Sequence, residues 1–254
     1  MTAWQTPGMN HVILVPGAWH GAWCFDKVVA ELRARGVAVT ALNMPGHGGD
    51  PEPLGGLEAD VASTRNAIQR VGGPVVLLGH SYGGAVITEA AVDPATAARV
   101  KHLVYLAAFA PGAGESVGYW SVRNEGSTLR ALIRKSDTTE AASVVDTSDF
   151  AAAKEAFYAD CSDDDVRSAA GQLCPQRTAG LSTPLTGEPW RTLPTTYVVC
   201  TEDRAIPVAT QWEMAARITD ANPLARIVAW KASHSPFYSR PASVADVCEA
   251  AARA

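Results

Sequence analysis

The sequence predicts an α/β fold in which a mostly parallel, doubly wound sheet carries an inserted, mainly helical cap. Short apolar runs alternate with longer amphipathic ones along most of the 254 residues, and this alternation is typical of parallel strands joined by helices. Hydrophobic residues make up 47% of the chain, which is enough to bury one large core at this length. We therefore expect one α/β domain with an insertion rather than two unrelated domains.

The first part of the chain supplies strands and helices in strict alternation. Apolar runs bounded by breakers indicate buried strands, and runs with apolar residues on one face indicate helices. In order, they are a strand at His11–Val15, a helix at 23–35, a strand at 37–42, a helix at Leu57–Val71, a strand at 75–78 followed by a helix, and a strand at Val100–Leu106.

The alternation stops after Pro111. Residues 112–185 contain no run typical of a buried strand but several helix-like pieces, among them 150–159 and 163–173. The pattern then resumes with a strand at Thr195–Cys200, a helix at 208–218, a strand at Ala225–Trp230 and a helix at 241–252. We therefore predict a core domain formed by residues 1–110 and 186–254, and a cap formed by residues 111–185.

Composition and charge disfavour several classes of partner. The net charge is -5, and the 21 basic residues are scattered without a run, so we expect neither nucleic acid nor an anionic membrane as a partner. Residues 1–10 lack a basic region followed by an apolar run, and no stretch of about 18 uninterrupted apolar residues occurs. The cysteines are odd in number and widely spaced, which indicates reduced thiols in a cytoplasmic protein; they are Cys24, Cys161, Cys174, Cys200 and Cys248.

Ser81 lies at a predicted strand-to-helix turn. The apolar run 75–78 leads into Gly79-His80-Ser81-Tyr82-Gly83-Gly84, and a small apolar helix follows. A serine held on such a sharp turn needs small residues two positions before and two after it, so that strand and helix can approach. Gly79 and Gly83 meet that requirement, and we interpret the segment as a nucleophile elbow.

A serine hydroxyl is a weak nucleophile at neutral pH and needs a base that a carboxylate orients. His234 lies in a loop directly after the last predicted strand, whereas His102 lies inside a strand. Asp203 begins the turn after the strand Thr195–Cys200, and Glu202 beside it has the same chemistry. The order Ser, acid, His is the one expected for this kind of fold, and on chemistry alone Asp203 and Glu202 both stay candidates.

Backbone donors for a developing oxyanion are expected at the end of the first strand. There Gly17 lets a substrate carbonyl approach the backbone closely, and the N–H of Ala18 is one candidate donor. The N–H of Tyr82, directly after the serine, is the other. Each of these segments follows the carboxyl end of a predicted parallel strand, and open α/β sheets bind ligands at that edge.

These segments together resemble the α/β-hydrolase superfamily, and within it the branch of plant methyl-ester esterases and hydroxynitrile lyases. The resemblance covers most of the chain. In the family the aspartate matching Asp203 is the triad acid, so the resemblance favours Asp203 over Glu202, and Pro16 departs from the histidine of many relatives. The segments that carry the resemblance are VPGAWHGAW at 15–23, MPGHG at 44–48, GHSYGG at 79–84, CTED at 200–203 with IP at 206–207, and SHSP at 233–236.

Two positions distinguish the esterases from the lyases of this branch. The lyases carry a threonine where this chain has Gly17 and a lysine where it has Ser235. Without that lysine no fixed cation stabilises a departing cyanide. The resemblance therefore implies an esterase-like serine hydrolase, and it disfavours hydroxynitrile lyase activity. Relatives in this branch are often dimers, so it also implies a homodimer as a candidate state.

We expect hydrolysis of a small apolar or aromatic carboxylic ester, with neither a metal nor an organic cofactor. Gly17 and the cap residues Tyr119, Trp120 and Phe157 are the candidate substrate contacts, although aromatic residues of a cap also serve as its core. A lactonase, a thioesterase or a carbon–carbon bond hydrolase would use the same triad. A ligand-binding receptor or scaffold with little turnover is the alternative from another class.

Overall fold

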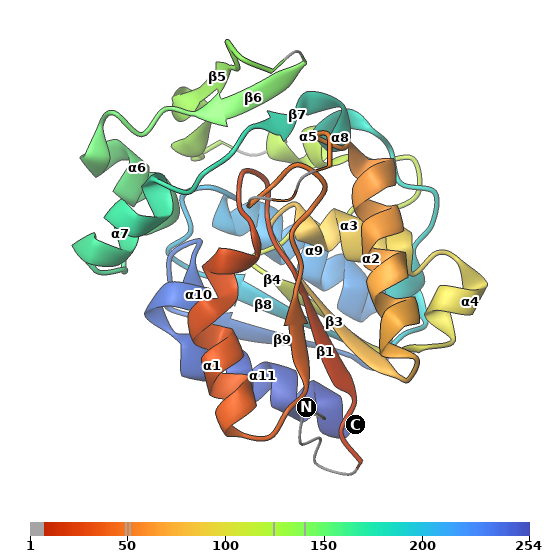
Figure 1. Ribbon diagram of the computed structural model, residues 1–254. Helices are drawn as coiled ribbons and strands as arrows, with labels where there is room; N and C mark the ends of the chain where they lie inside the picture. The colour runs from red at the N-terminus through yellow and green to blue at the C-terminus, as the bar shows by residue number, and fades with distance from the viewer. Residues whose placement is uncertain (1–7, 49, 51, 124, 140) are drawn as a thin grey trace.

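A computed structural model describes residues 8–48, 50, 52–123, 125–139 and 141–254. Its centre is a parallel sheet whose strands lie in the order β2-β1-β3-β4-β8-β9 (Figure 1). This order confirms the predicted doubly wound α/β fold. The strands are β1 (His11–Val15), β2 (Val39–Ala41), β3 (Val75–His80), β4 (Val100–Leu106), β8 (Thr195–Cys200) and β9 (Ala225–Trp230).

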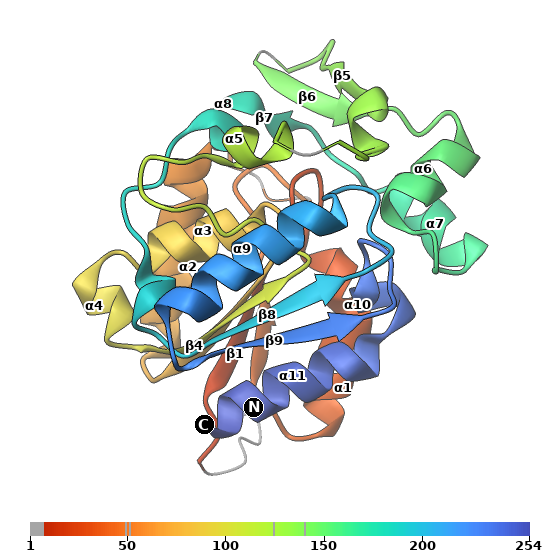
Figure 2. The same ribbon diagram turned by 180° about the vertical axis from the view of Figure 1, so that it is seen from behind.

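Helices cover both faces of this sheet. One face packs on α1 and α11, and the other packs on α2, α3 and α9 (Figures 1 and 2). The core helices are α1 (Asp26–Ala34), α2 (Leu57–Val71), α3 (Gly83–Ala90), α4 (Pro94–Ala97), α9 (Val208–Ala221), α10 (Pro236–Ser239) and α11 (Pro241–Arg253), with the 3₁₀ turns η1 (Ala22–Phe25) and η3 (Pro189–Arg191).

The strands are apolar along their length because both of their faces are buried. In β1, Ile13 and Val15 belong to the cluster with α2, α3 and α9, whereas Val12 and Leu14 belong to the cluster with α1 and α11. The same alternation holds for Leu77 and Leu78 in β3. Burial on both faces fixes the register, so the loops after the strands are held at one edge of the sheet.

Two predicted elements differ in extent. The strand expected at 37–42 is only Val39–Ala41, because it lies at the edge of the sheet and pairs on one side with β1. The helix expected at 23–35 begins with the 3₁₀ turn η1 and continues as α1. Among the described residues, none of the helices is long and apolar enough to cross a membrane, and all five cysteines are free thiols.

The cap lies over the carboxyl ends of the central strands (Figures 1 and 2). Besides helices it contains an antiparallel sheet in the order β5-β6-β7 that the sequence did not predict. These strands have two to four residues each, too few to give a recognisable alternation. The elements are α5 (Val117–Ser121), η2 (Leu129–Leu132), β5 (Ile133–Lys135), β6 (Ala142–Val145), α6 (Phe150–Phe157), α7 (Asp163–Ala170), β7 (Gln176–Arg177) and α8 (Thr178–Ser182).

Candidate active site

Ser81 lies in the sharp turn between β3 and α3, with a φ of 53°. That left-handed conformation is uncommon for a residue other than glycine and persists where the surroundings hold it. A Cβ on Gly79 would lie 2.4 Å from the Gly83 carbonyl oxygen, and one on Gly83 would lie 2.4 Å from the Val15 carbonyl oxygen. Only glycine therefore fits at both positions, and the close packing of β1, β3 and α3 fixes the position of the serine.

His234 contacts a carboxylate after the neighbouring strand. Its Nδ1 donates to Asp203 Oδ2 at 2.7 Å, and both side chains are buried. This bond leaves Nε2 of the neutral ring as the basic nitrogen. Glu202 instead lies at the surface, 3.6 Å from Lys231. Of the two acidic residues that chemistry left open, Asp203 is the one in contact with the histidine.

The Asp203 carboxylate accepts hydrogen bonds at both of its oxygens. Oδ1 accepts the N–H groups of Ala205 and Ile206 at 2.7 and 2.9 Å, and Oδ2 accepts the Gln211 amide at 2.8 Å in addition to His234. These hydrogen bonds fix the orientation of the buried carboxyl group. Asp203 is therefore held as a fixed acceptor that orients the imidazole.

His80 connects the serine turn to the histidine loop. Its Nε2 donates to the His234 carbonyl at 2.8 Å, and the two imidazole rings lie 4.6 Å apart. Burial lowers the pKa of His80 well below its ordinary value, and the nearby His234 and His20 lower it further. His80 is thus a neutral donor, and its hydrogen bond holds the loop of His234 close to the turn that carries Ser81.

The expected oxyanion donors lie on both sides of Ser81. A Cβ on Gly17 would lie 2.9 Å from Ser81 Cβ, so the loop after β1 passes directly beside the serine. Within the described part of the chain, the N–H groups of Ala18 and Tyr82 have no protein acceptor. Unpaired N–H groups next to a nucleophile are what a developing oxyanion requires.

Ser81, Ala18 and Tyr82 line one cavity of about 100 Å³ between the core and the cap. Its walls are mostly apolar, and the exceptions besides Ser81 are the side chains of Ser121, Ser127 and Arg130. The other lining residues are Trp19, Phe109, Ala205 and Ile206 from the core, and Val117, Ser121, Ser127, Leu129, Arg130, Ile133 and Leu181 from the cap. An apolar, largely closed cavity excludes water from the reacting group and strengthens the electrostatic interactions there.

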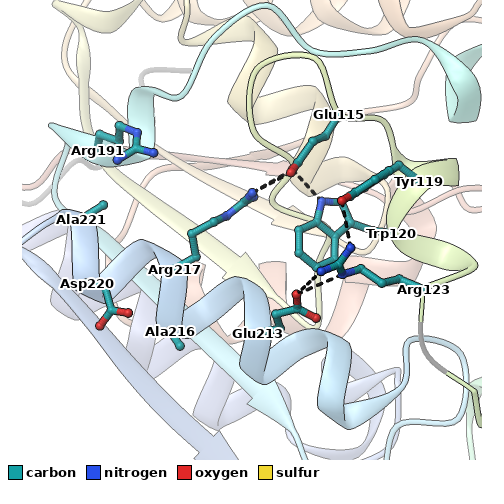
Figure 3. A pocket seen from close by; sticks show the side chains of 10 residues that line it. All are labelled: Glu115, Tyr119, Trp120, Arg123, Arg191, Glu213, Ala216, Arg217, Asp220 and Ala221. Atoms are coloured by element: carbon teal, nitrogen blue, oxygen red, sulfur yellow. Dashed lines mark hydrogen bonds and ion pairs between the residues drawn. The ribbon is translucent and has the colours of Figure 1, made fainter.

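The predicted substrate residues Tyr119 and Trp120 are not part of this cavity. Figure 3 shows them in a second, wider cavity of about 660 Å³ between α5 and α9, together with Arg123 and Arg217. The reason is helical geometry, because Val117 and Ser121 of α5 are four residues apart and face Ser81. Tyr119 and Trp120 lie on the other faces of the same short helix.

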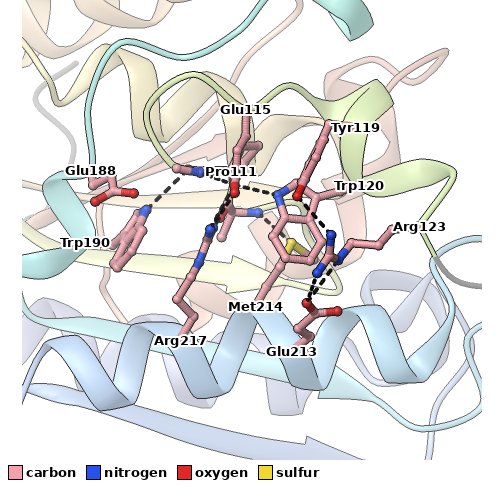
Figure 4. A network of polar contacts seen from close by, with 12 residues as sticks. Pro111, Glu115, Tyr119, Trp120, Arg123, Glu188, Trp190, Glu213, Met214 and Arg217 are labelled. Atoms are coloured by element: carbon pink, nitrogen blue, oxygen red, sulfur yellow. Dashed lines mark hydrogen bonds and ion pairs between the residues drawn. The ribbon is translucent and has the colours of Figure 1, made fainter.

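The second cavity is built around a network of partly buried polar groups (Figure 4). Glu115 accepts the Trp120 indole N–H at 2.8 Å and the Gly112 N–H at 2.7 Å, and it pairs with Arg217 at 2.9 Å. Arg217 also donates to the Ala110 carbonyl at 2.8 Å. These bonds fasten the start of the cap to α9 and to the loop after β4, which is a structural role.

Phe157, the remaining predicted substrate contact, is buried behind the histidine. Its ring lies 5.8 Å from the His234 ring and 5.5 Å from the His20 ring. It is not among the residues that line the cavity of Ser81. Phe157 therefore supports the side of the imidazole instead of meeting that cavity.

Three further residues position this site, and the sequence did not single them out. Gln211 donates to Asp203 and accepts the Cys200 N–H at 2.9 Å. Asp160 of the cap accepts a hydrogen bond from Ser233, the neighbour of His234. Neither residue belongs to a motif, and only the packing of α9 and of the cap brings them to the site.

The third residue, Asp60 of α2, lies beneath Tyr82. Its Oδ2 accepts the Tyr82 hydroxyl at 2.6 Å, and its Oδ1 is buried without a partner among the described residues. Burial raises the pKa of this carboxyl from its ordinary 3.8 to about 7. No three His, Cys, Asp or Glu side chains of the described residues come together as a metal site requires.

Comparisons with known proteins agree with this geometry. The profile of the Alpha/beta hydrolase family matches residues 12–247. A pyrethroid hydrolase of Sphingobium wenxiniae is 30% identical over 246 residues, covering 94% of this chain and 86% of its own. The probable esterase PIR7A of Oryza sativa is 40% identical over 119 residues, covering 44% of this chain and 43% of its own.

A solved structure extends the likeness to three dimensions. The crystal structure of a pyrethroid hydrolase from Sphingobium faniae superposes with a TM-score of 0.80 at 28% identity. The superposition covers 94% of this chain and 95% of the other. The likeness therefore includes both the sheet and the segment inserted above it.

Proposed function

Since the chain belongs to the alpha/beta hydrolase family and is a carboxylic ester hydrolase, we propose that it cleaves small apolar or aromatic esters through an acyl-enzyme on Ser81. One observation carries the proposal. A strained serine and two unpaired backbone N–H groups line one cavity, and the residue before that serine is hydrogen-bonded to the loop that carries the buried His–Asp pair. Each of them has a defined task in acyl transfer.

In the first step, Nε2 of His234 takes the proton of the Ser81 hydroxyl as its oxygen attacks the ester carbonyl. Asp203 holds the imidazole in the tautomer that leaves this nitrogen free. The carbonyl oxygen gains negative charge, and the N–H groups of Ala18 and Tyr82 bind it. His234 then gives its proton to the leaving alcohol, so the acyl group stays on Ser81.

In the second step, water attacks the acyl-enzyme with His234 again as base, and the carboxylic acid leaves Ser81. The buried Asp203 accepts four donors from its surroundings throughout, namely His234, Gln211, Ala205 and Ile206. It can therefore stabilise the imidazolium that forms in each step without taking its proton.

The mostly apolar walls of the cavity are the reason for proposing esters with small hydrophobic groups as substrates. A matched relative is named a pyrethroid hydrolase, and the named plant relative is a probable esterase. A cytoplasmic location and a homodimer, both expected from the sequence, stay predictions. The same triad would also serve a lactone, a thioester or a carbon–carbon bond substrate.

The test is hydrolysis of p-nitrophenyl acetate and butyrate by the wild type and by Ser81→Ala. We expect hydrolysis by the wild type, and a loss of about 10⁶-fold in kcat for the variant. The Ser127→Ala variant removes a hydroxyl from the same cavity and is expected to keep its activity within about tenfold of the wild type. Equal turnover by Ser81→Ala and the wild type would contradict the proposal. A folded wild type without any turnover would favour a receptor.

A further inference from the structure

Trp19 is the largest side chain in the wall of the cavity at Ser81. It follows Ala18 directly, so it is one residue away from the expected oxyanion donor. Only 5% of its surface is exposed. The ring therefore occupies space beside the reacting atoms instead of covering the protein surface.

The cap anchors this residue at both its backbone and its side chain. The indole N–H donates to the Ser143 carbonyl at 3.1 Å and to Ser143 Oγ at 3.3 Å, and both acceptors belong to β6. The Trp19 carbonyl accepts the Cys174 N–H at 3.0 Å. The ring also packs edge-on against Phe157, with centroids 6.4 Å apart.

The backbone of Trp19 is in an unfavourable conformation that these contacts maintain. Its φ is 63°, in the left-handed region that a bulky residue rarely adopts. Such a conformation persists only where the surroundings over-determine it. Since the indole N–H is hydrogen-bonded to Ser143, the ring cannot turn away to enlarge the cavity without breaking those bonds, and the bond from Cys174 holds the backbone.

The size of the cavity limits what can be attached to Ser81. In an acyl-enzyme the acyl group is bonded to the serine oxygen, so it must fit into space that adjoins Ser81. An apolar cavity of about 150 Å³ holds one benzene molecule, and the cavity here measures about 100 Å³. A short aliphatic acyl group fits this space, whereas an aromatic acyl group exceeds it.

We propose that Trp19 is the residue that limits the acyl group to a short aliphatic chain. This inference rests on the proposed ester hydrolysis at Ser81. The inference adds that one side chain, held in place by the cap, sets the size limit of the acyl group. Leu129, Ile133 and Leu181 of the cap also line the cavity, but none of them lies next to the oxyanion donors in the chain.

The experiment measures kcat/KM for p-nitrophenyl esters from acetate to octanoate, and for the benzoate. For the wild type we expect the highest values at acetate to butyrate. In Trp19→Ala, the ratio of kcat/KM for hexanoate to that for acetate is expected to rise about tenfold or more, as is typical when a pocket accepts added methylenes. Trp212→Ala, at an exposed position of α9, is the matched control and should keep the wild-type profile.

Trp19→Phe provides a second variant in case the alanine variant does not fold. The smaller ring lacks the indole N–H, and we expect its optimum to move by one or two carbons toward longer chains. An unchanged profile in folded Trp19 variants that still need Ser81 would overturn the role of Trp19. Benzoate and octanoate cleaved by the wild type as fast as acetate would also overturn it. Absence of Ser81-dependent hydrolysis with every ester would instead overturn the proposed function itself.

Discussion

Two cavities lie on either side of the short helix α5, and they differ in both size and chemistry. The one at Ser81 measures about 100 Å³ and has apolar walls around one nucleophile. The one at Trp120 measures about 660 Å³ and is lined by Glu115, Arg123, Arg217 and other charged side chains (Figure 3). None of the residues to which the proposed reaction is assigned lines the larger cavity.

The difference lies in how the polar groups are used. Around Trp120 the guanidinium and carboxylate groups pair with one another and remain partly exposed, as Arg123 does with Glu213 at 2.9 Å. Next to Ser81 the side chains of His80, Asp203 and His234 are buried, and two backbone N–H groups have no acceptor among the described residues. Burial, backbone strain and unpaired donors therefore indicate the reactive site better than volume does.

The largest expected effect is the loss of the base at the smaller cavity. Replacing His234→Ala removes the group that takes the Ser81 proton, and we expect kcat for p-nitrophenyl acetate to fall by about 10⁶-fold. His11→Ala is the control, because His11 bonds Thr40 at 2.8 Å at the start of β1. Steady-state kinetics compare the two. Comparable losses in both variants would show that the effect is structural.

The next effect concerns stability and pH beneath Tyr82. The pKa of Asp60 is about 7 in the folded protein and 3.8 ordinarily, so between these values the folded state holds a proton that the unfolded state has lost. The free energy of unfolding therefore falls as the pH rises from 4 to 7, by up to about 4 kcal/mol from this group.

Asp60→Asn removes this titration while keeping an acceptor for the Tyr82 hydroxyl. The variant is therefore expected to gain stability relative to the wild type as the pH rises through this window. Urea unfolding of both proteins at pH 4.5, 6 and 7.5 measures the difference. Parallel pH dependences of wild type and variant would mean that Asp60 does not titrate in this range.

A smaller effect on kcat is expected when the hydrogen bond from Gln211 to Asp203 is removed. Gln211→Met keeps the length of the side chain but removes the bond of 2.8 Å to Asp203. A hydrogen bond to a charged group contributes about 1.5–3 kcal/mol, so we expect kcat to fall about tenfold or more with little change in KM. Gln172→Met, at an exposed position in the cap, should match the wild type. A kcat of Gln211→Met within twofold of the wild type would show that Gln211 does not position Asp203 for catalysis.

The smallest effect is expected at the larger cavity. Arg123 and Glu213 form an ion pair whose side chains are 43% and 41% exposed, and exposed pairs contribute little to stability because solvent screens them. Arg123→Ala should therefore leave the free energy of unfolding close to that of the wild type and leave kcat/KM unchanged. A large loss of activity on the same short esters would give the larger cavity a catalytic role and would contradict the assignment of catalysis to the smaller cavity alone.

The sequence predicted the sheet and the strand-end loops because their constraints are local. Gly79 and Gly83 must be glycines for the serine turn to close, and burial on both faces makes each central strand apolar along its length. The positions of Ser81, Asp203 and His234 follow from that arrangement, because parallel strands present their carboxyl ends at one edge.

The cap was less predictable because its residues are placed by packing between segments. Tyr119 and Trp120 lie on the same short helix as Val117, yet the register of α5 turns Val117 toward the cavity of Ser81 instead. Gln211 reaches Asp203 only because α9 packs on β8 beside the loop that carries Asp203. Neither the orientation of α5 nor the contact of Gln211 with Asp203 can be predicted from hydrophobic periodicity or from a local motif.

The proposed mechanism requires a covalent intermediate on Ser81, which mass spectrometry can detect. The wild type and Ser81→Ala are treated with an ethyl fluorophosphonate, and the masses of the intact proteins and of their proteolytic peptides are measured. We predict one adduct per wild-type chain on the peptide that carries Ser81, loss of ester hydrolysis in proportion to labelling, and no adduct on the variant. Full labelling elsewhere, or hydrolysis that persists in the fully labelled enzyme, would contradict the account.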